Sequence, residues 1–200
     1  MKDIQSNKDK RRIPIQKVGI KNIHYPVTVL DRQNKSQHTT ATVNMYVDLP
    51  HHFKGTHMSR FVEILNKHHG RISMREIDSI LESVVSKFKC RTAHMEIRFP
   101  YFIAGRAPVS GAESLMDYDC ALIGTLSKEG KKTHFDLIVE ASVPVTMVCP
   151  CSKAISKEGA HNQRSRIVIK IRSNELVWLE ELISMAESAA SCSPICRSVI

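Results

Sequence analysis

The sequence contains no long apolar segment, and this absence excludes several classes of protein. No hydrophobic run approaches the roughly eighteen residues that a membrane-spanning helix needs. Residues 1–16, MKDIQSNKDKRRIPIQ, are polar and basic with no apolar stretch behind them, so they do not read as a secretory signal. We therefore expect a cytoplasmic protein with no membrane partner.

Aromatic residues are also scarce, at 6% of the chain, although the net charge is +9. Such a charge fits a solvated basic surface, a nucleic-acid partner or a phosphorylated small molecule. No block of lysine and arginine is interleaved with aromatic side chains, which argues against nucleic acid. Of the two anionic partners, a phosphate-bearing small molecule is therefore favoured.

The chain has no CxxC motif, and its six cysteines do not indicate a disulfide framework in a reducing cytosol. Most of them are expected to be buried thiols. Only one closely spaced pair, Cys149 and Cys151, lies near a candidate metal-binding histidine, His161. The other four are Cys90, Cys120, Cys192 and Cys196.

Apolar periodicity predicts alternating groups of strands and helices. Ser73 and Glu76 form a capping-box pattern at the start of the second helix. Polar residues 32–37 suit a hairpin loop, and Pro26 is expected to interrupt the first strand. The expected strands cover residues 17–31, 39–48, 94–105, 114–126, 133–148 and 165–172, and the expected helices cover 58–69, 73–89 and 173–190.

The order of these elements predicts an α+β fold with an internal repeat. Residues 17–126 read strand, strand, helix, helix, strand, strand, and the pattern then restarts with two strands and a helix. We expect a basic arm at residues 1–16, a first unit at 17–126, and a second, incomplete unit at 127–200. An incomplete sheet would leave an open edge and an uncovered apolar face.

The stretch CPCSKAISKEGAHNQRS, residues 149–165, contains the most distinctive chemistry. Thiolate and imidazole are preferred zinc ligands, and a hairpin could place a cysteine opposite His161. The spacing alone matches no common structural zinc finger. A nucleophilic cysteine activated by a base, and an ordinary turn with two half-buried thiols, therefore stay open.

Two long motifs resemble the type IB GTP cyclohydrolases. They are VPVTMVCPCSKAISKEGAHNQRSRIVI, residues 143–169, and YVDLPHHFKGTHMSRFVEILN, residues 46–66. The resemblance extends from about residue 17 to Cys192. It implies a tunnelling fold, in which antiparallel sheets carry helices on one face and two tandem units per chain assemble into a homotetramer.

The same resemblance implies the hydrolysis of GTP to 7,8-dihydroneopterin triphosphate and formate, the first step of folate biosynthesis. It implies a divalent metal, with zinc, manganese and iron as candidates, held by Cys149 and His161, with Cys149 as the catalytic residue. Cys151 could tune this site through a metal ligand or could simply pack.

A second group of residues, at the start of the helix expected near residue 58, suits the triphosphate of GTP. His57, Ser59 and Arg60, with Lys54, place basic and hydroxyl groups at a helix N-terminus. The alternative is a solvated helix start that Ser59 caps.

The end of the sequence departs from the family pattern. In relatives a stretch resembling LLKRPDE follows, whose glutamate is the third metal ligand, and a further glutamate works in acid/base catalysis. Here SCSPICRSVI, residues 191–200, contains no Asp or Glu. We therefore expect a C-terminally truncated relative with weakened metal affinity. Two alternatives are a catalytically disabled remnant and a tunnelling-fold enzyme that uses Cys149 or Cys151 as a nucleophile.

Overall fold

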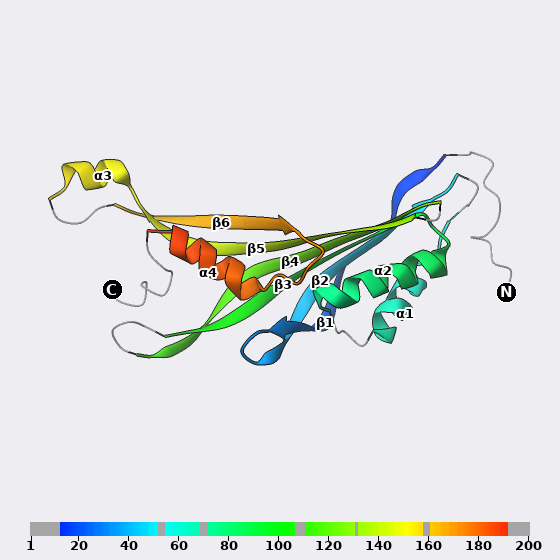
Figure 1. Ribbon diagram of the computed structural model, residues 1–200, viewed down its shortest axis with the longest axis horizontal. Helices are drawn as coiled ribbons and strands as arrows, with labels where there is room; N and C mark the ends of the chain where they lie inside the picture. Colours follow the sequence, from blue (N-terminus) through cyan, green and yellow to red (C-terminus); the bar gives the residue numbers. More distant parts are fainter. Residues whose placement is uncertain are drawn as a thin grey trace. The chain divides into compact units, whose positions relative to one another are not determined.

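The computed structural model describes residues 13–51, 55–68, 72–106, 111–130, 132–157 and 161–191. Within these ranges the chain forms six strands and four helices, which Figure 1 labels. In chain order they are β1 (Ile15–Asp31), β2 (Lys35–Leu49), α1 (Ser59–Lys67), α2 (Met74–Phe88), β3 (Thr92–Arg106), β4 (Glu113–Glu129), β5 (Lys132–Val148), α3 (Pro150–Ile155), β6 (Asn162–Arg172) and α4 (Leu179–Ala189).

The strands form one antiparallel sheet in sequential order, β1-β2-β3-β4-β5-β6, so the predicted α+β class is confirmed. The β1–β2 hairpin closes where Asp31 pairs with Lys35. Asp31 Oδ1 accepts hydrogen bonds from the amides of Gln33 and Asn34, at 2.8 and 2.7 Å, which is the local pairing that favours Asp in turns.

The predicted interruption of β1 at Pro26 is wrong. Pro26 pairs in register with Thr40, and the irregularities lie between Ile15 and Val18 and between Ile20 and Ile23. Since β1 stands at one end of the strand order, the missing N–H of a proline need not cost a ladder hydrogen bond.

The chain divides into two compact units. The first comprises residues 1–99, 121–139 and 172–176, and the second comprises 100–120, 140–171 and 177–200. Strands β3, β4 and β5 therefore contribute residues to both. The tandem units predicted at 17–126 and 127–200 describe a repeat in the sequence and stay a prediction.

In the first unit, α1 and α2 lie together against one face of the strands (Figure 1). The rings of Phe61 and Phe88 stack with centroids 4.3 Å apart and join the two helices. The apolar periodicity of these elements predicts two further members of the helix faces, His68 and Phe88, which are only half-buried. The other side chains expected on these faces are almost wholly buried: Ala41, Val43, Met45, Val47, Phe61, Ile64, Leu65, Ile77, Ile80, Leu81 and Val84.

In the second unit, α4 buries the apolar face that its sequence predicts, made of Leu179, Leu182, Ile183 and Ala186. Two buried tyrosines from the strands donate hydrogen bonds to the same helix. Tyr101 Oη lies 2.6 Å from Glu180 Oε1, and Tyr118 Oη lies 2.7 Å from Glu187 Oε1. Burial and the bond to Glu187 raise the pKa of Tyr118, so it remains a donor at neutral pH.

The helix boundaries correct three predictions. α4 begins at Leu179, with Trp178 as its N-cap, and residues 173–178 are not helical. There the Ser173 hydroxyl accepts from the Glu175 amide at 3.0 Å, a local bond that competes with helix formation. α3 was not predicted at all. α1 begins at Ser59, but Met58 is its N-cap and no side chain caps it.

At the start of α2, the Ser73 amide donates to Glu76 Oε2 at 3.0 Å, which is one of the two hydrogen bonds that a capping box makes. Most of the basic arm, Lys54, Gly70 and the tail from Cys192 lie outside the described residues. In the described part of the chain, no helix is long and apolar enough to cross a membrane.

Candidate metal centre

Cys149 stands between β5 and the short helix α3, where the chain leaves the sheet. Its backbone is extended, with φ −70° and ψ 116°, and Pro150 occupies the first turn of α3. Proline suits that position because its fixed φ is helical and its missing N–H would have no helical partner. The Cys149 carbonyl accepts the first helical bond, from the Lys153 amide at 3.1 Å.

The structure brings the backbones of Cys149 and His161 together. The Cys149 amide donates to the His161 carbonyl at 3.0 Å, and the His161 amide donates to Ser152 Oγ at 2.8 Å. The two residues therefore pair where β5 ends and just before β6 begins. Cys149 is half-buried and His161 is exposed, so the two residues lie opposite each other at an accessible edge.

A thiolate and an imidazole are a donor pair that suits zinc and related divalent ions. By its chemistry, the pair Cys149 and His161 fits a divalent metal. Catalytic zinc sites use three protein ligands and keep one open position. The described residues contain no cluster of three or more His, Cys, Asp or Glu side chains placed to hold a metal ion.

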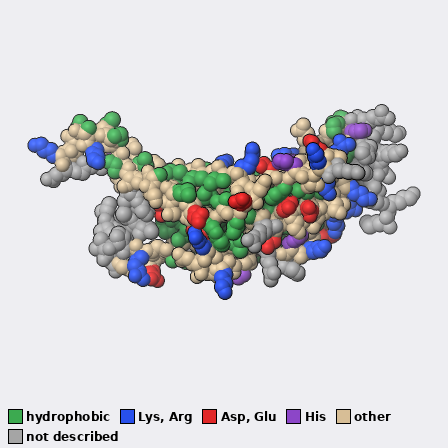
Figure 2. All heavy atoms as spheres, viewed as in Figure 1, with side chains coloured by type: hydrophobic (Ala, Val, Ile, Leu, Met, Phe, Trp, Pro, Cys, Tyr) green, Lys and Arg blue, Asp and Glu red, His purple; other side chains and the backbone are tan. Residues whose placement is uncertain are grey.

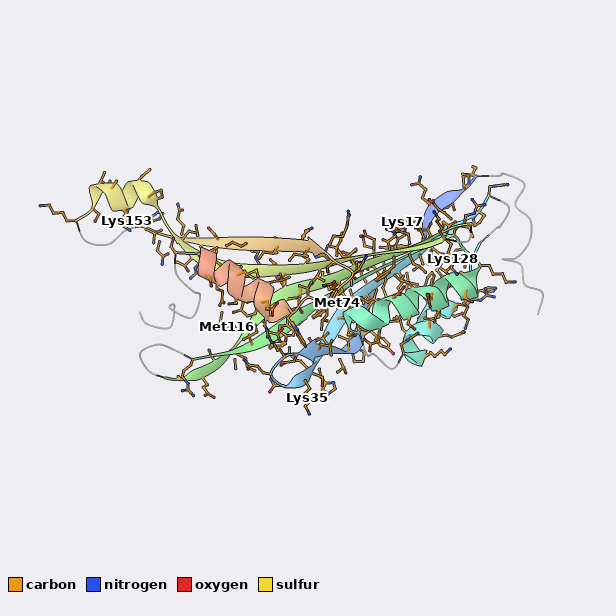
Figure 3. All side chains as sticks on the ribbon, in the orientation of Figure 1. Lys17, Lys35, Met74, Met116, Lys128 and Lys153 are labelled. Atoms are coloured by element: carbon orange, nitrogen blue, oxygen red, sulfur yellow. The ribbon has the colours of Figure 1, made fainter. Side chains whose placement is uncertain are left out.

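Cys151 is exposed in the first turn of α3, a helix that buries none of its side chains. It therefore does not pack into the core of the described chain. Figure 2 shows hydrophobic and basic side chains at the surface of α3, where Ile155 is 89% exposed. Figure 3 shows the α3 side chains, with Lys153 labelled, standing clear of the strands.

Two other cysteines, Cys90 and Cys120, are buried as predicted. Burial raises the pKa of each thiol to about 12. They stay protonated at neutral pH, which makes them poor nucleophiles, because the thiolate is the reactive form. Cys192 and Cys196 lie outside the described residues.

The candidate phosphate-binding residues lie at the start of α1. His57 accepts a backbone hydrogen bond from the Arg60 amide at 3.3 Å, which forms the turn before the helix. Arg60 is half-buried and Ser59 is exposed. Ser59 does not cap α1, so the alternative role predicted for it is wrong. His57, Ser59 and Arg60 belong to the first compact unit, and Cys149, Cys151 and His161 belong to the second.

Sequence reasoning missed Ser152, whose hydroxyl binds the His161 backbone. The available signal was Pro150, since a proline directly after Cys149 marks a helix start. It also missed cross-strand pairs between β5 and β6. Lys170 Nζ lies 2.9 Å from buried Glu140, and Arg166 binds Ser142 Oγ at 3.0 Å. These pairs join β5 to β6, the two strands that hold the ends of the Cys149–His161 loop.

Comparison with known proteins agrees with the motifs. A family model described as "Type I GTP cyclohydrolase folE2" matches residues 1–196. A GTP cyclohydrolase FolE2 from Syntrophus aciditrophicus is 57% identical over 191 residues, which are 96% of this chain and 73% of the relative. Relatives of the same name from Geobacter metallireducens and Geobacter sulfurreducens are 51% and 52% identical over 195 residues, covering 98% of this chain and 72% and 73% of their own lengths. The chain therefore belongs to the GTP cyclohydrolase FolE2 family.

Proposed function

We propose that this chain hydrolyses GTP to 7,8-dihydroneopterin triphosphate and formate, with a divalent ion held by Cys149 and His161. Membership in a family of GTP cyclohydrolases supports the reaction. The observation that supports the site is the 3.0 Å hydrogen bond from the Cys149 amide to the His161 carbonyl. It holds a sulfur ligand and a nitrogen ligand in neighbouring positions.

Zinc, manganese and iron are the candidate ions. When bound, such an ion supplies Lewis acidity, which lowers the pKa of water towards neutrality and favours attack on the imidazole ring of guanine. Cys149 and His161 would hold it, and exposed Cys151 would affect its affinity through the neighbouring ligand. The described residues of one chain group no third such side chain with them, so a third protein ligand is proposed to come from another part of the protein or from a second copy.

His57, Ser59 and Arg60 are proposed to bind the triphosphate. The half-buried guanidinium of Arg60 can donate two hydrogen bonds to phosphate oxygens at once, and Ser59 adds an exposed hydroxyl. This role needs no proton transfer from these side chains, since their function is to hold and orient the substrate.

We also propose that the fold is the tunnelling fold of the family, with two tandem units per chain and a homotetrameric assembly. The element order supports this proposal, because two strands, two helices and two strands are followed by two further strands and α4. Sedimentation of the purified chain would test the assembly.

The function is tested by measuring formate and oxidised neopterin from GTP, with the chelated protein reloaded with zinc, manganese or ferrous iron. We expect Cys149→Ala and His161→Ala to lose turnover with every metal, and Cys151→Ala to retain a measurable fraction. Full turnover by Cys149→Ala would show that the ligand assignment is wrong.

A second arm addresses the length of the chain, which spans 73% of the Syntrophus relative. Fusing to this chain the part of that relative that the match does not cover is expected to restore or raise turnover. Inactivity of both proteins with bound metal would contradict the proposed function. A covalent substrate adduct on Cys149 or Cys151, detected by mass spectrometry without metal, would instead favour a cysteine nucleophile.

A further inference from the structure

We propose that Ser152 is a positioning residue for the metal-binding pair, acting through the backbone of His161. This inference rests on the proposed function, because it assumes that Cys149 and His161 bind a metal. The Ser152 hydroxyl fixes His161 before the ion arrives, so the free protein already holds both ligands in neighbouring positions.

The geometry is a closed set of hydrogen bonds around His161. Its carbonyl accepts from the Cys149 amide at 3.0 Å, and its amide donates to Ser152 Oγ at 2.8 Å. Both partners of His161 belong to the start of α3, where the Lys153 amide donates the first helical hydrogen bond to the Cys149 carbonyl at 3.1 Å. Both polar groups of the His161 backbone are thus held by the segment that contains Cys149.

This arrangement matters because His161 is exposed and lies just outside β6. Its side chain leaves the backbone in a direction that the backbone torsions determine. The contact with Cys149 restrains the carbonyl group of His161, and the contact with Ser152 restrains its amide group. Fixing a ligand in its bound conformation improves affinity by lowering the entropy lost on binding.

A purely helix-stabilising role for Ser152 makes a different prediction. The bond to Ser152 Oγ comes from His161, which is outside α3, and not from the backbone of the helix itself. Alanine has a higher helix propensity than serine. Ser152→Ala should therefore leave α3 at least as stable, and any loss of metal affinity would come from the lost contact with His161.

The test is a zinc titration of the metal-free chain against a chromophoric chelator. Contacts that orient a metal ligand typically change affinity by about 10- to 100-fold, and we expect a weakening in this range for Ser152→Ala. Ser156→Ala, the same change at the exposed end of α3, is the matched control and should bind zinc as wild type does. Amide hydrogen exchange at His161 should accelerate in Ser152→Ala alone.

Ser152→Thr and Ser152→Val form a second pair of nearly equal shape, with and without the hydroxyl. Threonine should preserve zinc affinity and slow exchange at His161, and valine should behave like alanine, so the comparison decides even if Ser152→Ala folds poorly. Equal zinc affinity for wild type, Ser152→Ala and Ser152→Val would overturn the positioning role and leave the metal site standing. A wild-type chain that binds no zinc would overturn the metal site, and the positioning role with it.

Discussion

Burial separates the four cysteines whose surroundings the structure describes into two kinds. Cys90 and Cys120 are buried, and their pKa values rise to about 12. Cys149 is half-buried and Cys151 is exposed, both in the segment next to His161. Residue type alone therefore does not separate accessible thiols from buried ones, whereas their position relative to the core does.

Buried Cys120 predicts a loss of stability at alkaline pH. Burial, followed by the charges of Asp119, Glu180 and Glu140, raises its pKa from 9.0 to about 12. Between these values the unfolded chain releases the proton and the folded chain keeps it. The stabilisation is therefore complete below pH 9 and is lost as the pH rises towards 12, by at most about 1.4 kcal/mol per pH unit.

Urea unfolding at several pH values checks this prediction. Cys120→Ala should reduce the decline in unfolding free energy above pH 9, and Cys90 should account for part of what remains. Cys151→Ala is the control, since that side chain is exposed. An unchanged slope in Cys120→Ala would contradict the expectation.

Arg60 offers a test of the proposed phosphate contact. Its replacement by alanine should raise KM for GTP roughly 10- to 100-fold, because a charged hydrogen bond contributes about 1.5–3 kcal/mol. Lys67→Ala, at the other end of α1, should leave KM almost unchanged. Equal effects of the two substitutions on steady-state kinetics would mean that Arg60 acts only through general charge.

At the scale of the elements, the sequence predicted those helices and strands that bury a continuous apolar face. Leu182, Ile183 and Ala186 of α4 are buried as expected. The same helix was predicted six residues too early, because Ser173 forms a local turn that periodicity does not show. α3 escaped prediction because its six residues bury no side chain and so carry no amphipathic pattern.

The contact between α2 and β4 depends on the absence of a side chain at Gly124. A Cβ there would lie 2.6 Å from Ile77 Cγ2 and 3.0 Å from Leu81 Cδ1. We expect Gly124→Ala to lower the unfolding free energy by about 1–3 kcal/mol through overpacking. In an Ile77→Ala background the same change should cost less, since the space is then open. Additive effects in urea unfolding would contradict this explanation.

At the scale of the whole molecule, the order of the strands and of every helix except α3 could be predicted from the sequence, and so could the hairpin that places Cys149 opposite His161. Cys149 and His161 were singled out by residue type and by resemblance. The second contact with the His161 backbone, from Ser152 in α3, was missed, because Pro150 was the only mark of that short helix in the sequence. Likewise, the membership of β3, β4 and β5 in both compact units follows from three-dimensional contacts and not from sequence order.

The net charge of +9 predicts an effect of salt on substrate capture. A basic protein attracts the triphosphate over distances that salt shortens to about 10 Å at 0.1 M. KM for GTP should therefore rise with sodium chloride, while kcat changes little. Kinetics at matched osmolality, with sucrose in place of salt, provide the control. A KM independent of ionic strength would show that the overall charge plays no part in binding.

The most direct test of the metal centre is the near-ultraviolet absorption of the chain titrated with cobalt(II), a spectroscopic substitute for zinc. Wild type and Cys151→Ser should show a thiolate-to-cobalt charge-transfer band, and Cys149→Ser should lack it. This result would establish Cys149 as the sulfur ligand beside His161. A band that persists in Cys149→Ser and disappears in Cys151→Ser, or that is absent from wild type, would contradict the account.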